Sequence, residues 1–541
     1  MYKNIFFNRN FYLEILTKHF KDFVEGYRQN LAFIGNELVG KTSLILYFLN
    51  KFTDNRILTI YISVKKEDFK SFAEKFMKSI LYNFLHNSGI ELKEDFDYLI
   101  NKSEKFIPYT VKKIKEIRSA FKKKKNSIFL ELLSICDILN KETKKLSVVI
   151  IDEFHNLETM GIKDLYKDWA KVLVLQKNTM FIVISSSKFK AKKILGSSLN
   201  VLFGKFELID VEPFDYKTSR EFLIYGLNGL NLENKLVDFL ISISGGIPFY
   251  LKIFAESIYK IKDRFPDSYI NKDAVLDVLA DLLFEEDGII NQRFCNFLNK
   301  IYGERIENES LKILCCISSG YNRINDMMQI LNISKKIISK SLHQLLEVDI
   351  ISKNGDFFKI NDRLFSLWLS LVYRKKDFGL DFDFSKQYRI FREELGEIYD
   401  QFIAHSNKGL LERLIEIMNL FEDAYVDVDN RRINLTNFRE IKPILFESMS
   451  IREGLIARSV DHLWIVGIKR NSLKEEDIEE FSRFCNKYKQ KKQRRIIVTS
   501  SEVDSNVRLK ALEEKILTWE LKNINLLCEL FNRPLILDNA L

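Results

Sequence analysis

The sequence predicts an α/β protein that begins with a parallel β-sheet covered by helices on both faces. In residues 1–212, short apolar runs alternate with segments of helical periodicity, which is the pattern of βαβ units. The apolar runs are continuous rather than alternating with polar residues, as expected of strands buried on both faces. The chain has 541 residues, 46% hydrophobic and 29% charged. This length predicts roughly two to four domains, each with its own core.

Five apolar runs are expected to be the strands of this sheet. They cover residues 31–34, 57–64, 146–151, 180–184 and 206–211. The long connection between the second and third runs carries amphipathic patterns over 69–85 and 128–138, which predict helices. Because βαβ crossovers are right-handed and place their helices over the sheet, a three-layer domain follows.

A glycine-rich turn follows the first predicted strand and precedes an apolar helix. It fits the pattern G-x-x-x-x-G-K-[ST], and with the next serine it comprises Gly35, Asn36, Glu37, Leu38, Val39, Gly40, Lys41, Thr42 and Ser43. Glycines let backbone N–H groups curl around a phosphate, and the helix N-terminus adds partial positive charge there. Lys41 is expected to reach the β- and γ-phosphates, and the Thr42 hydroxyl to bind Mg²⁺. The predicted ligands are therefore ATP and Mg²⁺.

Two carboxylates end the third apolar run, at Asp152 and Glu153. Carboxyl ends of parallel strands lie where nucleotides bind, so Asp152 is predicted to hold Mg²⁺, directly or through water. Glu153 is predicted to polarise the attacking water, which makes it, with Lys41, a predicted catalytic residue. Three serines at 185–187 end the next run. One of them is expected to contact the γ-phosphate or the water, unless they form a simple polar strand end.

Taken together, these motifs resemble those of the archaeal-type ATPase family, a branch of the AAA+/STAND P-loop ATPases. Further matching pieces are Phe7-Asn8-Arg9, the run 152–157, Gly204-Lys205 and the segment 245–251. The resemblance covers residues 1–375. It implies a P-loop ATPase core over 1–212 and a helical lid over 213–300. The family usually has Arg where Lys205 stands, and an Arg there is a candidate γ-phosphate sensor. Lys205 keeps the charge but loses the planar guanidinium. If the position is catalytic, ATP turnover is expected to be slow.

Residues 301–375 are predicted to form a winged helix-turn-helix, with helices over 311–319, 324–331 and 335–346 and then a hairpin. The third helix is predicted to bury Ile337, Ile338, Leu342, Leu345 and Leu346. Its other side carries Lys335, Lys336, Ser339, Lys340 and His343. This basic side suits double-stranded DNA. The alternative is that the winged helix only packs against its neighbours.

Members of this family often end in a domain similar to the PD-(D/E)XK nucleases, which implies an α/β restriction-endonuclease-like fold for residues 391–541. Glu412 resembles the helical acid of those enzymes, and Lys469 resembles their lysine. Gly454 and Gly467 stand where those nucleases carry acids, and glycine offers Mg²⁺ no oxygen ligand. We therefore predict a degenerate domain with little or no cleavage. Four carboxylates remain as substitutes, namely Asp427, Asp429, Glu453 and Asp461.

The remaining composition narrows the protein class. A net charge of +9 permits a nucleic-acid partner without requiring one. Two basic runs, 122–125 and 487–495, are either phosphate contacts or solvated helix ends. The six cysteines form no C-x-x-C pair, which argues against a disulfide framework and a structural zinc site. With neither a secretory signal nor a membrane span in view, a cytoplasmic protein with no membrane partner is expected.

The predicted function is Mg²⁺-dependent hydrolysis of ATP to ADP and phosphate, coupled to the binding of double-stranded DNA. Two alternatives stay open. One is a nucleotide-gated scaffold that binds DNA or signals without catalysis, and the other is a DNA nuclease gated by the ATPase. Homo-oligomerisation or a separate protein partner also stays open.

Overall fold

The computed structural model describes residues 6–86, 94–122, 125–200, 205–264, 269–302, 308–373, 383–446, 450–488 and 492–537. The chain divides into two compact units. The first comprises residues up to Pro213 together with Glu347–Asp349, and the second comprises the remainder from Phe214. No helix in these described ranges is both long enough and apolar enough to cross a membrane.

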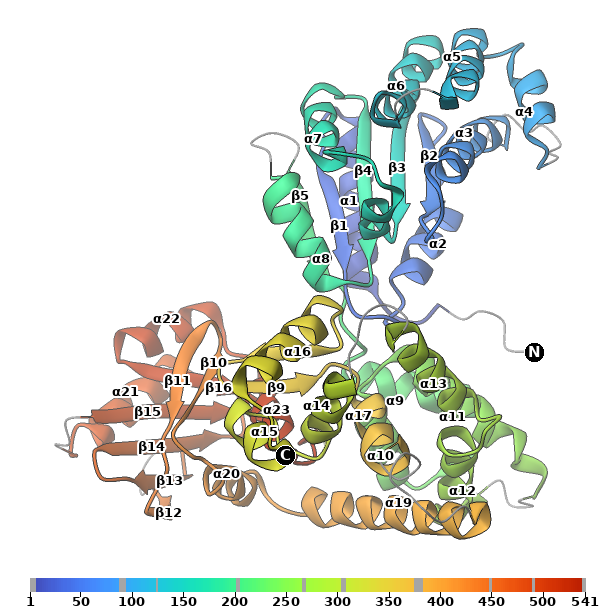
Figure 1. Ribbon diagram of the computed structural model, residues 1–541. Helices are drawn as coiled ribbons and strands as arrows, with labels where there is room; N and C mark the ends of the chain where they lie inside the picture. The colour runs from blue at the N-terminus through green and yellow to red at the C-terminus, as the bar shows by residue number, and fades with distance from the viewer. Residues whose placement is uncertain are drawn as a thin grey trace. The chain divides into compact units, whose positions relative to one another are not determined.

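The first unit is built on a five-stranded parallel sheet with strand order β2-β3-β4-β1-β5. Its strands are β1 (Asn30–Ile34), β2 (Ile57–Ser63), β3 (Leu146–Asp152), β4 (Thr179–Ser185) and β5 (Phe206–Asp210). All five lie where the continuous apolar runs predict them, so the predicted α/β fold with a parallel sheet is confirmed. Because β4 lies between β1 and β3, the ends of these three strands are neighbours in space (Figure 1).

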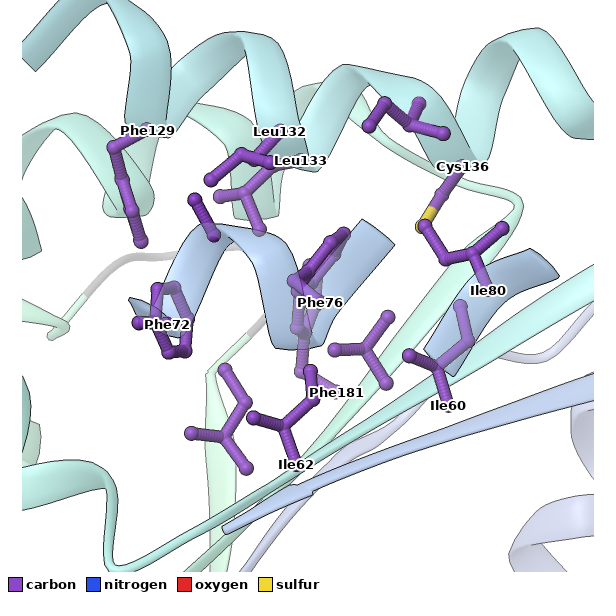
Figure 2. Close-up of a cluster of buried hydrophobic side chains, with 14 of the residues drawn as sticks. Ile60, Ile62, Phe72, Phe76, Ile80, Phe129, Leu132, Leu133, Cys136 and Phe181 are labelled. Carbon is purple, nitrogen blue, oxygen red and sulfur yellow. The ribbon is translucent and has the colours of Figure 1, made fainter. Parts of the chain in front are cut away.

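Helices cover both faces of this sheet. One face carries α1 (Asn10–Val24) and α2 (Lys41–Lys51). The other carries α3 (Phe69–His86), α6 (Lys125–Thr143) and α7 (Leu165–Leu175). Figure 2 shows the second core, where Phe72 and Phe76 of α3 lie between α6 and strand residues such as Ile62.

Shorter elements complete the first unit. They are α4 (Phe96–Ser103), α5 (Pro108–Ser119), α8 (Lys188–Lys193), the 3₁₀ helices η1 (Ala120–Lys122) and η2 (Phe154–Met160), and the π-helix η3 (Ile194–Ser198).

The second unit begins with helices. They are α9 (Tyr216–Leu227), α10 (Asn234–Ser244), α11 (Pro248–Lys260), α12 (Lys272–Leu283) and α13 (Ile289–Tyr302), with short strands β6 (Asn231–Leu232) and β7 (Tyr269–Ile270) and the 3₁₀ helix η4 (Lys262–Arg264). Gly245 and Gly246 separate α10 from α11, with φ of 60° and 72°. A Cβ on Gly246 would lie 2.2 Å from the Phe214 carbonyl oxygen, so this turn requires glycine.

Three helices and an antiparallel hairpin follow. They are α14 (Asn308–Ser318), α15 (Ile324–Leu331), α16 (Lys335–Glu347), β8 (Ile351–Asn354) and β9 (Phe357–Ile360), continued by α17 (Arg363–Trp368) and η5 (Leu369–Tyr373). On α16 the prediction that Ile337 is buried is wrong, because this side chain is 42% exposed. The buried line runs through Ile338, Leu342 and Leu345, and Ile337 lies about 100° around the helix from Ile338.

The last part of the chain forms a mixed sheet with order β12-β13-β14-β15-β16. Its strands are β12 (Glu440–Leu445), β13 (Glu453–Arg458), β14 (His462–Lys469), β15 (Lys492–Thr499) and β16 (Ile516–Glu520). The first three pair antiparallel, and the last three pair parallel.

Helix α19 (Phe384–Ser406) packs against α10 and α12, where Tyr399 meets Phe239 and Phe391 meets Phe284. Other helices and a hairpin surround the mixed sheet. They are α20 (Leu410–Met418), β10 (Ala424–Val428), β11 (Arg431–Leu435), α21 (Glu475–Cys485), α22 (Ser505–Glu513) and α23 (Leu521–Leu530). Helices α20 and α23 pack on one face of the sheet. Helices α21 and α22 pack on the other face.

Candidate nucleotide site

The glycine-rich loop joins β1 to α2, and its geometry requires glycine at both ends. A Cβ on Gly35 would lie 2.4 Å from the Val211 carbonyl oxygen. Gly40 is the N-cap of α2 and has a φ of 92°, which other residues rarely adopt. Between them, Val39 is fully buried and anchors the loop to the core. The loop therefore leads directly into a helix N-terminus, where backbone N–H groups and the helix dipole favour an anion.

Lys41 is the first residue of α2 and is only 5% exposed. Its Nζ donates to the carbonyl oxygens of Gly35 (2.9 Å) and Asn36 (2.7 Å). Burial lowers the pKa of Lys41, whereas the nearby carboxylates of Glu153 and Asp152 oppose that change. The ammonium group of Lys41 thus lies across the loop, close to two carboxylates. Ser43, the last residue of the predicted loop, is exposed on the first turn of α2.

Asp152 ends β3 and is 3% exposed. Its Oδ2 accepts hydrogen bonds from the Thr42 hydroxyl (2.7 Å) and from the Tyr61 hydroxyl (2.7 Å). Its Oδ1 is buried and has no hydrogen-bond partner among the described residues. A buried carboxylate oxygen without a donor, beside a threonine hydroxyl, fits a divalent cation or a water bound to it. The structure therefore brings together the two residues that the sequence predicts for Mg²⁺.

Glu153 follows β3 with a φ of 55°, an uncommon conformation for a residue other than glycine. Its Oε2 accepts from the Ser186 hydroxyl (2.7 Å) and backbone N–H (3.2 Å). Burial raises the pKa of Glu153, and the bonds from Ser186 oppose that rise. The neighbouring Ser185 contacts His155 Nδ1 at 2.8 Å, and His155 Nδ1 is 3.4 Å from Glu153 Oε2. The polar end of β4 thus serves to hold the predicted base.

Two further residues support this site, and their roles do not follow from the sequence. Arg9 donates from its guanidinium to the carbonyl oxygens of Val39 (2.9 Å) and Glu212 (2.8 Å), so it fixes the loop from outside. In the sequence, Arg9 stands out only as part of Phe7-Asn8-Arg9, one of the pieces that resemble the archaeal-type ATPase family. Tyr61 gives no signal, because a tyrosine within a β-rich run is most simply explained as a core residue.

The comparisons agree with this geometry. Residues 6–254 match the family model of an ATPase domain predominantly from Archaea. This match identifies an ATPase domain in the chain. No curated protein matches the chain in sequence.

Several solved structures match the chain at low identity. A Walker-type ATPase of Pyrococcus abyssi is 20% identical with a TM-score of 0.46, covering 67% of this chain and 96% of that one. The ORC2 protein of Aeropyrum pernix, solved in ADPNP–ADP complexes, is 10% identical with a TM-score of 0.44, covering 73% and 98%. The RuvB Holliday junction branch migration motor of Thermotoga maritima is 13% identical with a TM-score of 0.31, covering 67% and 94%.

Lys205 lies away from the loop of the ATPase domain. It immediately precedes β5, and its carbonyl oxygen accepts from the Gln29 side chain at 2.9 Å. In the parallel sheet, Phe206 pairs with Asn30 at the start of β1, whereas the loop follows the end of β1. At about 3.3 Å per residue, the length of β1 separates the two sheet edges by more than 10 Å. Lys205 is therefore not brought to the site of its own chain, and Gly204 is outside the described residues.

In the C-terminal sheet, the two glycines at predicted acid positions face each other across β13 and β14. A Cβ on Gly454 would lie 2.1 Å from the Val466 carbonyl oxygen and 2.6 Å from Phe446. A Cβ on Gly467 would lie 2.9 Å from both Ile451 and Phe481. Apolar side chains therefore fill the space in which metal-binding carboxylates would stand.

The other residues of the predicted nuclease site are also engaged elsewhere. Lys469 Nζ lies 3.1 Å from Asp477, an ion pair with 15% and 5% side-chain exposure. Glu412 is exposed on α20, whose Leu410 and Leu414 pack on the sheet face opposite that of Gly467 and Lys469. Glu412 and Lys469 lie on opposite faces because side chains alternate along β14. Residues 464, 466 and 468 face α20, and residues 463, 465 and 467 face α21.

The four substitute carboxylates do not gather. Glu453 pairs with Arg470 at 2.8 Å, and Asp429 lies 3.7 Å from Arg508. Asp427 accepts from the Gly355 backbone N–H at 3.2 Å, and Asp461 is exposed immediately before β14. Within the described ranges, no group of three or more carboxylate, histidine or cysteine side chains could hold a metal ion.

The hairpin of β8 and β9 is docked by its tip on β10. The Asp356 N–H donates to the Tyr425 carbonyl oxygen (2.9 Å), and the Tyr425 N–H donates to the Asp356 carboxylate (2.8 Å). Asn354 exchanges two further bonds with the Asp427 backbone, of 2.9 and 2.8 Å. A Cβ on Gly355 would lie 2.0 Å from the Tyr425 carbonyl oxygen. This tip is therefore covered by protein.

The basic residues predicted to contact DNA fall into two groups. On α16 the predicted side is exposed, and its members are Lys335, Lys336, Ser339, Lys340 and His343. In the run 487–495, by contrast, Arg494 lies 4.7 Å from the Trp464 ring centroid and donates to the Asn434 carbonyl oxygen, and Arg495 donates to Asn486. The remaining lysines of the two runs include Lys123, Lys124, Lys489 and Lys491, which lie outside the described residues.

Proposed function

We propose that the ATPase domain binds ATP with Mg²⁺ at the loop Gly35–Ser43 and hydrolyses it to ADP and phosphate. The observation that carries this proposal is the 2.7 Å bond between the Thr42 hydroxyl and Asp152, beside the buried ammonium of Lys41. These three groups come from two separate segments of the chain and converge at one helix N-terminus. Such convergence of a hydroxyl, a carboxylate and a cation supports a site for a magnesium-bound triphosphate.

Each residue has a defined task in this proposal. Lys41 exchanges the carbonyl oxygens of Gly35 and Asn36 for phosphate oxygens, which gives its buried charge a stronger partner. Thr42 and Asp152 would hold Mg²⁺, which supplies charge neutralisation at the phosphate oxygens. Glu153 orients the attacking water and accepts its proton, and its raised pKa makes the carboxylate a better base than an exposed one.

Two variants test this proposal. Lys41→Ala is expected to abolish ATP binding, measured by titration with a fluorescent ATP analogue. Glu153→Gln is expected to bind ATP normally while phosphate release stops. Unchanged binding in the first variant together with unchanged turnover in the second would overturn the mechanism.

We further propose double-stranded DNA as a partner, bound through the exposed basic side of α16. The succession of α14, α15, α16 and a hairpin supports a winged helix-turn-helix over residues 301–375, between a helical lid over 213–300 and a nuclease-like domain over 391–541. Since the hairpin tip is covered by β10, α16 is the element left for the major groove or the phosphates. Titration of labelled duplex at several salt concentrations tests this contact.

The packing around Gly454 and Gly467 supports a nuclease-like domain without cleavage, rather than a gated nuclease. The non-catalytic scaffold is the rival function, and the position of Lys205 away from the loop favours it. Steady-state phosphate release with and without duplex DNA separates the two, because a scaffold releases none in either condition. Since Lys205 lies at the far sheet edge, it can serve a γ-phosphate only in a second copy of the chain, which makes homo-oligomerisation part of this test.

A further inference from the structure

Tyr61 makes an unexpected contact in the ATPase domain. It lies on β2, the edge strand beside β3, where Ser63 pairs with Asp152 and Tyr61 pairs with Ile150. From this register its side chain reaches along the sheet, and its hydroxyl donates to Asp152 Oδ2 at 2.7 Å. The contact lies on the same oxygen that accepts the Thr42 hydroxyl.

The two bonds give the carboxylate of Asp152 a single orientation. Oδ2 is saturated by protein donors, while the buried Oδ1 has no partner among the described residues. The plane of the carboxylate is therefore fixed before any cation arrives, with one oxygen turned away from the protein donors.

Tyr61 is suited to hold a neighbour in place. Its ring packs against the core between the sheet, α1 and α2, and its carbonyl oxygen accepts from the Ser79 hydroxyl of α3 at 3.2 Å. The hydroxyl therefore ties the carboxylate of Asp152 to a ring that is itself held by the core.

We propose that Tyr61 is a positioning residue for Mg²⁺: its hydroxyl holds Asp152 in the orientation that accepts the metal carried by ATP. This inference rests on the proposed function of the loop and of Asp152. It differs from a purely structural role, in which the hydroxyl merely finds an acceptor and its loss would change stability alone.

The test is Tyr61→Phe, which removes one oxygen and keeps the ring. Binding of a fluorescent ATP analogue is titrated with Mg²⁺, and the analogue is also titrated in EDTA. A hydrogen bond to a charged group contributes about 1.5–3 kcal/mol, so the Mg²⁺ concentration for half-maximal effect should rise by roughly 10- to 100-fold. Binding in EDTA should stay within about twofold of wild type, since no phosphate contact is removed.

Two further variants interpret the result. Tyr166→Phe is the matched control, because its hydroxyl donates to the Phe154 carbonyl oxygen at 3.1 Å rather than to Asp152, and it should leave the Mg²⁺ requirement unchanged. Asp152→Asn is the reference for the site itself. If Asp152→Asn leaves the Mg²⁺ requirement unchanged, the proposed function fails. If Asp152→Asn raises it while Tyr61→Phe leaves it unchanged or lowers it, only the role of Tyr61 is overturned.

Discussion

Replacing Gly467 tests whether apolar packing has taken the place of a metal site in the C-terminal sheet. In Gly467→Ala the new methyl group would meet Ile451 and Phe481, each at 2.9 Å, on the fully buried face of β14. Overpacking of this size costs about 1–3 kcal/mol. In Gly467→Glu a carboxylate would enter the same apolar cluster without a partner, so the cost should exceed about 4 kcal/mol.

Amide hydrogen exchange followed by mass spectrometry is the suitable assay, because it reports the local opening free energy of β13 and β14 separately from the rest of this two-unit chain. The loss in Gly467→Ala should appear in peptides of these strands. Gly396→Ala on α19 is the matched control. Its Cβ would lie 3.7 Å from Leu276, an ordinary contact, so replacing a helical glycine should stabilise by about 0.5–1 kcal/mol.

Two results would refute this reasoning. One is protection of β13 and β14 in Gly467→Ala equal to that of wild type, which would mean that the space is not filled. The other is Mg²⁺-dependent plasmid cleavage by the double variant Gly454→Asp with Gly467→Glu, which would mean that the carboxylates alone were lacking.

Three further predictions concern other parts of the chain. Ser186→Ala removes a hydrogen bond that lowers the pKa of Glu153, so that pKa should rise and the acidic limb of the kcat profile should move to higher pH; an unmoved limb would separate Ser186 from the base. Gly355→Val should detach the hairpin tip from β10, because a Cβ would lie 2.0 Å from the Tyr425 carbonyl oxygen. Residues 351–360 should then show faster proteolysis or faster amide exchange than in wild type. Unchanged protection of these residues would contradict the prediction. The combined change of Lys335, Lys336 and Lys340 to Ala should weaken duplex binding without regard to base sequence and reduce the slope of log affinity against log salt by roughly one per lost phosphate contact; an unchanged slope would remove α16 from the DNA interface.

The sequence alone was enough to predict the sheet and the glycine-rich loop. Apolar runs are sufficient evidence for the five strands, which all lie where they are expected, although β5 carries Glu207 and is only partly buried. The loop motif is local, since the glycines, Lys41 and Thr42 are joined by a single turn. The meeting of Thr42 with Asp152 also follows, because a strand-end carboxylate and a strand-end loop in one parallel sheet share an edge.

Only the tertiary structure shows which further residues contact the candidate nucleotide site and which side chains fill or cover the other predicted sites. Tyr61 reaches Asp152 because β2 pairs with β3 in one register, and Lys205 is remote because the start of β5 lies at the opposite sheet edge. The filled space at Gly467 depends on Ile451 and Phe481, and the covered hairpin tip depends on β10. Periodicity and motifs show which face a residue takes within its own helix or strand and what chemistry its close neighbours offer. These contacts instead join residues that are distant in sequence, and strand register and packing decide which of them meet.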